Sequence, residues 1–247
     1  MTTAPEPAPA PAGAPGFLAT LAEVFVAPGD AFREIAARPR WDAPLVLAIV
    51  VGLAFTAIWI WKADPVEFMR TQMEESGAIE SIPPEKRADV LRAQAKWLTA
   101  FAWIGPLFFA PIGYAALAAL FYFIYRFFYA AEVSFAQSLA VVAWCFAAFG
   151  LVMNPLIVIV MTLKNEWSVD PSSVVQASAA ALLDKAATSG PLYALAGSLD
   201  LFTFWLMALL AIGYGAAIGR KASAAAWPIV ILWALYAAGK CVLAAIF

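Results

Sequence analysis

The chain has 247 residues, of which 64% are hydrophobic and 13% are charged, whereas a soluble domain is about 45–50% apolar and about 25% charged. A soluble protein of this composition would expose large apolar patches and aggregate, so the composition predicts a multi-pass membrane protein. The formal net charge of -2 and the lack of a run of basic residues exclude nucleic acid as an expected partner.

The chain contains no histidine. This excludes Ser-His-Asp and Cys-His catalysis and HExxH zinc sites, and it removes the favoured ligand of most transition metals. Cys145 and Cys241 lie in apolar segments without metal-ligand spacing, so we interpret both as small buried hydrophobic residues. The sequence also lacks P-loop, GxSxG and GxGxxG motifs. We therefore expect no cofactor, no metal site and no enzymatic activity.

The first forty residues are not long or apolar enough to span a membrane. Residues 1–16 alternate proline and alanine and lack the bulky side chains that a core requires, so we expect a disordered tail. In 17–40, apolar residues such as Phe32 can share one face on each of two short helices that Pro28 separates. We expect amphipathic helices at the membrane interface, and packing of the same helices on the bundle is compatible with this.

Five apolar segments follow, and each is long enough to cross a hydrocarbon core about 30 Å thick, which takes roughly 20 residues. Aromatic residues mark several of their ends, as in the aromatic belts of membrane proteins. The predicted transmembrane helices cover about 43–61, 97–125, 137–163, 199–219 and 226–247. The predicted fold is therefore all-α, with a five-span membrane domain at 41–247 preceded by amphipathic helices.

Two long polar segments separate these spans. In 62–96, Asp64 and Pro65 start one predicted helix, and Pro84 starts another that we expect to continue into the second span without a break. In 164–198, we predict a weakly amphipathic helix from Pro171 to about residue 187.

Several residues inside the spans are expected to bend helices or to join them. Pro106 and Pro111 in the second span and Pro155 in the third should kink their helices. The bundle or nearby hydroxyl groups must then pair the carbonyls that these prolines free. Beside Pro155, we expect Asn154 to bridge two helices, an interaction worth about 1 kcal/mol. The alternative is that Asn154 lines a cavity.

Two charged residues lie in the hairpin formed by the last two spans. Asp200 stands at the start of the fourth span, and Lys240 lies inside the fifth. If the turn aligns Gly219 with Ala226, their depths differ by about 7–8 Å at 1.5 Å per residue, a gap that a lysine side chain can bridge. We predict a structural ion pair, because an unpaired charge at the bilayer centre costs about 2.5–3.5 kcal/mol. The alternatives are a proton- or ion-coupling role, or a Lys240 side chain that extends to the surface alone.

The distribution of basic residues predicts the orientation. Six Lys/Arg residues near membrane ends fall on one side, and eight lie in the two long loops together with acidic residues. The six are Arg33, Arg38, Arg40, Arg126, Arg220 and Lys221. By the positive-inside rule, this bias places the amino terminus in the cytoplasm and the long loops outside it.

Three stretches carry a resemblance to a known family. They read FVAPGDAFREIAARPRWDAPL (25–45), EVSFAQSLAVVAW (132–144) and SLDLFTFWLMALLAIGYGAAIGRKASAAAW (198–227). In order and spacing they resemble the Yip family of five-span membrane proteins, whose eukaryotic members interact with Rab/Ypt GTPases. The third stretch is the best match. The resemblance implies a five-helix bundle with a cytoplasmic amino terminus and without catalytic residues.

These observations lead to two main hypotheses. The first is a bacterial Yip-family protein of the inner membrane, a non-enzymatic scaffold or adaptor whose partners are the lipid bilayer and other membrane proteins or a second copy. Eukaryotic relatives act in vesicle traffic, which bacteria lack, so GTPase binding is not carried over. The second is a small transporter or channel component, which requires Asn154, Asp200 and Lys240 around one polar path. An intramembrane enzyme would need a nucleophile–base or paired-carboxylate set, which is not found.

Overall fold

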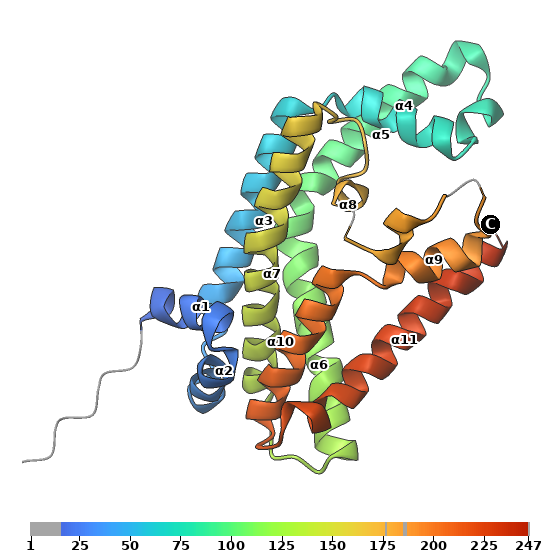
Figure 1. The fold of residues 1–247 in the computed structure, drawn as a ribbon. Helices are drawn as coiled ribbons and strands as arrows, with labels where there is room; N and C mark the ends of the chain where they lie inside the picture. Colours follow the sequence, from blue (N-terminus) through green and yellow to red (C-terminus); the bar gives the residue numbers. More distant parts are fainter. Residues whose placement is uncertain (1–15, 176, 185–186, 247) are drawn as a thin grey trace, which may run out of the picture.

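The computed structural model describes residues 16–175, 177–184 and 187–246, so the predicted disordered tail lies outside the described residues except for Gly16. Within these ranges the secondary structure is helical, apart from one isolated antiparallel bridge between Ser178 and Asp200 (Figure 1). The predicted all-α class is therefore confirmed.

The membrane part of the protein is a bundle of long apolar helices. Four are long and apolar enough to cross a membrane: α3 (Asp42–Lys62), the helix formed by α5 (Pro84–Ile104), η2 (Gly105–Phe109) and α6 (Ala110–Phe128), α7 (Phe135–Lys164) and α11 (Ala222–Ile246). A further apolar helix, α10 (Leu201–Ala217), is shorter, with 17 residues. Each of the five predicted spans coincides with one of these helices, as expected of a polytopic membrane protein.

The apolar segment before the fourth predicted span forms a helix of its own. A separate helix, α9 (Gly190–Ser198), ends two residues before α10 begins, and Figure 1 shows it turned away from α10 and lying against α11. Its two ends are fixed on α11, because the Trp233 indole N–H donates to the Ser198 carbonyl (3.3 Å) and the Cys241 thiol to the Pro191 carbonyl (3.4 Å). α9 therefore runs antiparallel to the second half of α11.

The predicted continuity between the first long loop and the second span is confirmed. The first loop forms α4 (Pro65–Glu75) and the short η1 (Ala78–Ser81), and the Asp64 side chain caps α4 by accepting from the backbone N–H of Val66 (2.8 Å). The helix that starts at Pro84 then runs for 45 residues, about 68 Å at 1.5 Å per residue. Because this exceeds the bilayer core, α4 and the first turns of α5 project beyond the bundle (Figure 1).

The backbone of this long helix is distorted locally at Pro106. This residue lies in η2, where the backbone adopts a π-helical turn. A proline removes the hydrogen bond to the carbonyl four residues earlier, here that of Ala102, and the Thr56 hydroxyl of α3 donates to that oxygen at 3.1 Å. Gly52 of α3 makes the approach possible, since a Cβ there would lie 2.9 Å from the Pro106 Cβ. A hydroxyl of a neighbouring helix thus pairs the freed carbonyl.

The helix predicted from Pro171 to residue 187 is wrong. In the described part of this segment only α8 (Pro171–Val174) and η3 (Ala179–Leu182) are helical. The intervening backbone pairs with the linker between α9 and α10, because Ala179 N–H donates to the Leu199 carbonyl (3.0 Å) and Leu201 N–H to the Ala177 carbonyl (3.1 Å). The serines and valines of the segment also have low helix propensity.

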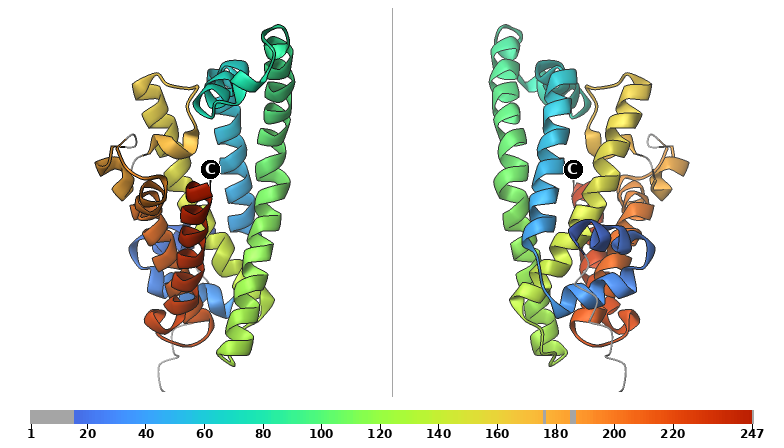
Figure 2. Two further views of the ribbon diagram at one scale, coloured as in Figure 1. Left: turned by 90° about the vertical axis from the view of Figure 1, so that its right-hand side faces the viewer. Right: turned by 90° about the vertical axis from the view of Figure 1, so that its left-hand side faces the viewer.

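The two predicted amino-terminal helices are present as α1 (Phe17–Val26) and α2 (Pro28–Ala37). α2 is built into the bundle: Phe32 is fully buried, and its ring lies close to Gly213 of α10. α1 keeps Leu18 and Val26 exposed, as a helix at the membrane interface would. Figure 2 shows both helices beside the end of the bundle that holds the α10–α11 turn.

Candidate functional site

Asp200 is the amino-terminal cap of α10. Its Oδ1 accepts a hydrogen bond from the backbone N–H of Thr203 at 2.8 Å. Aspartate is among the preferred residues at this position, because its side chain pairs a backbone donor that the helix leaves free. The Asp200 carboxylate therefore has a local structural role, which is to cap α10 where the chain leaves α9.

Lys240 has a different neighbour. Its Nζ lies 5.6 Å from the ring centroid of Tyr236, one turn earlier on α11. The four ion pairs recorded among the described residues each join two residues three or four positions apart, and none includes Lys240 or Asp200. The structure therefore does not bring the predicted pair together.

The register of α9 and α10 along α11 explains this difference. The predicted alignment placed Gly219 opposite Ala226, and therefore placed Asp200 higher on the hairpin than Lys240. Instead Ser198 is bonded to Trp233, which lies two turns, about 10 Å, before Lys240 on α11. The segment beside Lys240 is the start of α9, where Pro191 is bonded to Cys241.

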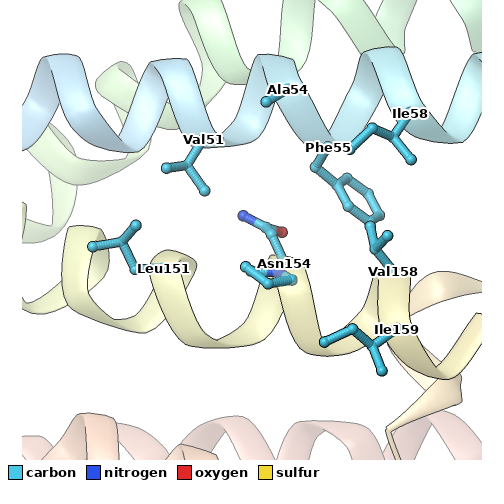
Figure 3. A pocket seen from close by; sticks show the side chains of 9 residues that line it. Val51, Ala54, Phe55, Ile58, Leu151, Asn154, Val158 and Ile159 are labelled. Atoms are coloured by element: carbon cyan, nitrogen blue, oxygen red, sulfur yellow. The ribbon is translucent and has the colours of Figure 1, made fainter.

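Asn154 lines a groove between α3 and α7. The groove has a volume of about 320 Å³ and is otherwise apolar; it is lined by Val51, Ala54, Phe55, Ile58, Leu151, Asn154, Pro155, Val158 and Ile159. Figure 3 shows the Asn154 amide pointing from α7 towards α3. Among the described residues no hydrogen bond joins this amide to α3. The side chain therefore takes the second of the two predicted roles and lines a cavity.

The predicted polar residues do not share a common path. Asn154 faces the groove between α3 and α7, and neither Asp200 nor Lys240 lines that groove. Pro155 lies in the same groove, whereas Pro106 packs on Gly52, and Pro111 lies in the first turn of α6. In the described part of the chain, the residues that the transporter hypothesis requires around one lumen therefore lie apart.

A buried polar cluster joins four helices at the opposite end of α7. The Ser138 hydroxyl donates to the Ala118 carbonyl (2.6 Å) and shares a hydrogen bond with the Tyr214 hydroxyl (2.7 Å). The Tyr125 hydroxyl donates to the Ala225 carbonyl (2.6 Å), and the rings of Tyr125 and Tyr214 stack with their centroids 4.7 Å apart. We call Ser138, Tyr125 and Tyr214 the tyrosine–serine cluster. It ties together α6, α7, α10 and α11.

The tyrosine–serine cluster was not predicted from the sequence. Ser138 and Tyr214 are separated by 76 positions, so their pairing is invisible in sequence order. One signal was available: a tyrosine placed between Gly213 and Gly215 in an apolar span needs a hydrogen-bond partner for its hydroxyl.

A second set of hydrogen bonds holds the end of α2 against α7. Ser134 and Gln137 form a capping box at the start of α7, and the Gln137 amide also donates to the Ala36 carbonyl at 2.9 Å. One turn beyond α2, the Arg40 carbonyl accepts from the Trp144 indole N–H at 3.0 Å. These bonds join the first two of the three stretches that carry the family resemblance.

The chemistry of the buried groups is that of helix association. Ser138 and Cys145 are completely buried, and a general base that would activate either one is not among their partners. Among the described residues no group of three or more His, Cys, Asp or Glu side chains is placed to hold a metal ion. The cluster therefore fixes helices relative to one another.

Comparison with known proteins identifies the family. The profile of the Yip1 domain matches residues 22–243. No curated protein and no solved structure has a significant match to the chain. The matched range contains α2, the start of α7 and the α10–α11 hairpin, which meet around the tyrosine–serine cluster. By the extent of this match, the chain belongs to the Yip1 domain family of integral membrane proteins.

Proposed function

We propose that this protein is a non-enzymatic scaffold or adaptor of a bacterial inner membrane, with its amino terminus in the cytoplasm. The tyrosine–serine cluster carries the proposal. Its hydroxyl groups are paired with one another or with backbone carbonyls of neighbouring helices, which closes the interior at this end of the bundle. Such an interior favours a fixed platform over a conducting path.

The alternative, a small transporter or channel component, has weaker support. It requires Asn154, Asp200 and Lys240 to face one polar path, whereas they lie in three different surroundings. The groove at Asn154 is apolar on all other sides, and none of the described residues in its wall is charged.

The position of the basic residues supports the proposed orientation. Arg33 and Arg220 line one hollow at the end of the bundle where α10 turns into α11. The α4–α5 hairpin projects from the opposite end (Figure 1). With the basic end in the cytoplasm, this hairpin lies outside it and offers a surface of mixed charge, with exposed Arg70–Glu67 and Arg92–Asp89 pairs. We propose that it contacts other membrane proteins or a second copy of the chain.

Photo-crosslinking in cells tests the adaptor role. A photoreactive residue replaces Ala88, which is exposed on the projecting part of α5, and Ala238, which is exposed on α11, serves as the matched control. The proposal predicts discrete protein adducts at position 88 and lipid adducts at position 238. Adducts to lipid alone at both positions would overturn it.

A flux measurement tests the alternative. Purified protein in liposomes should give no proton or potassium flux above that of empty liposomes. A protein-dependent flux that Asn154→Leu abolishes would replace the scaffold with the transporter. Orientation is tested separately by labelling Ala88→Cys and Ser223→Cys in intact cells with an impermeant maleimide, and labelling of position 223 alone would reverse it.

A further inference from the structure

A hollow of about 480 Å³ opens between α2 and the α10–α11 turn. Its volume is in the range of small-molecule sites, about 300–1,000 Å³. The wall contains two arginines, Arg33 of α2 and Arg220 of the turn, and the remaining lining residues are glycine, alanine and isoleucine. No carboxylate lines it, so two positive charges face a pocket with an otherwise small and apolar wall.

Both guanidinium groups are held in place. The Arg220 Nη2 donates to the Tyr129 carbonyl at 3.1 Å, and its guanidinium carbon lies 5.6 Å from the centroid of the Tyr129 ring. The Arg33 Nε donates to the Gly29 carbonyl at 3.2 Å, and its Nη2 pairs with Asp30 one turn away. A guanidinium has five N–H donors, so each arginine keeps donors free for a ligand. Asp30 offsets part of the charge of Arg33, which leaves Arg220 as the uncompensated cation.

The backbone adds a further positive element. The ten-residue α2 begins at Pro28, and its N-cap residue Ala27 has no side chain that pairs the first backbone donors. Gly29, in that first turn, lines the hollow beside Arg33. The amino-terminal end of a helix favours negative charge, and here it faces the same space as the two arginines.

The hollow also lies at the depth of lipid headgroups. The α10–α11 turn ends two apolar helices, so it marks a membrane surface, and Ile212 and Ala216 of α10 line the side of the hollow towards the apolar part of the bundle. A matching ligand therefore has an anionic head and an apolar tail. A free phosphate would satisfy only the arginines.

We propose that this hollow binds the phosphate of an anionic glycerophospholipid. Arg220 and Arg33 donate to the phosphate oxygens, as arginine forks do with oxyanions, and the acyl chains leave along α10. Basic pockets between membrane helices commonly bind lipid headgroups in this way. The site goes beyond the scaffold role and would fix the bundle to one leaflet.

Native mass spectrometry of the detergent-purified protein tests the proposal. Phosphatidylglycerol and phosphatidylcholine with the same acyl chains are added at equal concentrations. The wild type should retain phosphatidylglycerol preferentially. Arg33→Gln and Arg220→Gln should each weaken retention about fivefold, the effect of about 1 kcal/mol per basic residue at an anionic surface. The matched control Arg92→Gln removes an equally exposed arginine of α5 and should leave retention unchanged.

Three outcomes would overturn the proposal. One is equal retention of the two lipids, and another is an equal loss in Arg92→Gln. The third is displacement of the bound lipid by millimolar inorganic phosphate, which would make this a phosphate site. If Arg220→Gln unfolds because its bond to Tyr129 is lost, Arg33→Gln decides the test, since both hydrogen bonds of the Arg33 side chain are to its own helix. Arg220→Lys keeps the charge but not the fork, and should restore retention only in part.

Discussion

The two halves of α7 have opposite surroundings. Between Ser138 and Ala148 every side chain except that of Phe146 is buried, whereas none is buried in the described residues 149–160. The first half is enclosed by α2, α6 and α10, and its polar groups are bonded to those helices. The second half faces α3 across the groove that contains Asn154.

The helices are therefore packed tightly around the first half of α7 and loosely around the second half. Helices α2, α6 and α10 meet around the first half, where residues of all three stretches that resemble the Yip family pack together. Around the second half the bundle leaves apolar surface for lipid or a partner. A change in the first half should therefore cost far more stability than an equal change in the second, and the predictions below test that difference.

Phe32→Ala should have the largest effect. The ring is fully buried between α7 and α10, and truncating such a side chain costs about 3–5 kcal/mol. Leu18→Ala on neighbouring α1 is the control, since Leu18 is 75% exposed, and its cost should stay within about 0.5 kcal/mol. The free energy of unfolding in detergent measures both. Equal losses would mean that α2 lies on the bundle surface and not in its core.

Gly213→Ala and Gly239→Ala compare the enclosed region with an exposed position on α11. A Cβ at Gly213 would lie 2.6 Å from Val141 Cγ1 and 3.0 Å from Phe32 Cδ1, whereas one at Gly239 would meet nothing within 4 Å. Overpacking should cost Gly213→Ala about 1–3 kcal/mol, while Gly239→Ala should gain up to about 1 kcal/mol of helix propensity. Thermal unfolding compares the stabilities of the two variants. Similar stabilities would show that close packing at Gly213 does not stabilise the bundle.

A double-mutant cycle on Ser138→Ala and Tyr214→Phe tests the polar side of the same region. Removing either partner of a buried hydrogen bond costs about 1–3 kcal/mol. The double variant should lose less than the sum of the singles, with a coupling energy of about 0.6–1.7 kcal/mol, as measured for hydrogen bonds between membrane helices. Additive losses would show that the two hydroxyl groups stabilise the bundle independently.

The sequence predicted those features that depend on residues close to one another in the chain. Apolar segments, the Asp64 cap, the start of α5 at Pro84 and the need for a hydroxyl near Pro106 all follow from nearby residues, and the structure contains each of them. Even there, sequence alone could not name Thr56 as the donor, because it belongs to a different helix.

Long-range pairing was not predictable in the same way. The backbone of 177–179 pairs with the linker between α9 and α10, and this removes the predicted loop helix. The depth predicted for Asp200 depended on the register between the last two spans, which contacts distant in sequence set differently, so its expected meeting with Lys240 did not appear. The pairing of Ser138 with Tyr214 could not be predicted either, because the two residues are far apart in the sequence.

Asp200→Ala and Asp200→Asn separate a helix cap from an ion pair. If Asp200 acts as the cap of α10, the alanine variant should lose about 1 kcal/mol, whereas asparagine, an equally good cap, should be nearly neutral. Lys240→Met should then leave stability unchanged. Equal losses in Asp200→Asn and Lys240→Met, without further loss in the double variant, would instead restore the ion pair.

The smallest effect is expected for Asn154→Leu in the open half of α7. The amide has no hydrogen bond to α3, and its groove is apolar, so replacing it with leucine should change the free energy of unfolding by no more than about 0.5 kcal/mol. Ser138→Ala, a smaller chemical change in the enclosed half, should cost more. Size-exclusion chromatography with light scattering is run alongside, because an unpaired amide in a membrane can also bond to another chain. If Asn154→Leu dissociates an oligomer, the open half is an interface between chains; if it destabilises the monomer, the amide bridges α7 and α3 and the two halves are less different than the structure indicates.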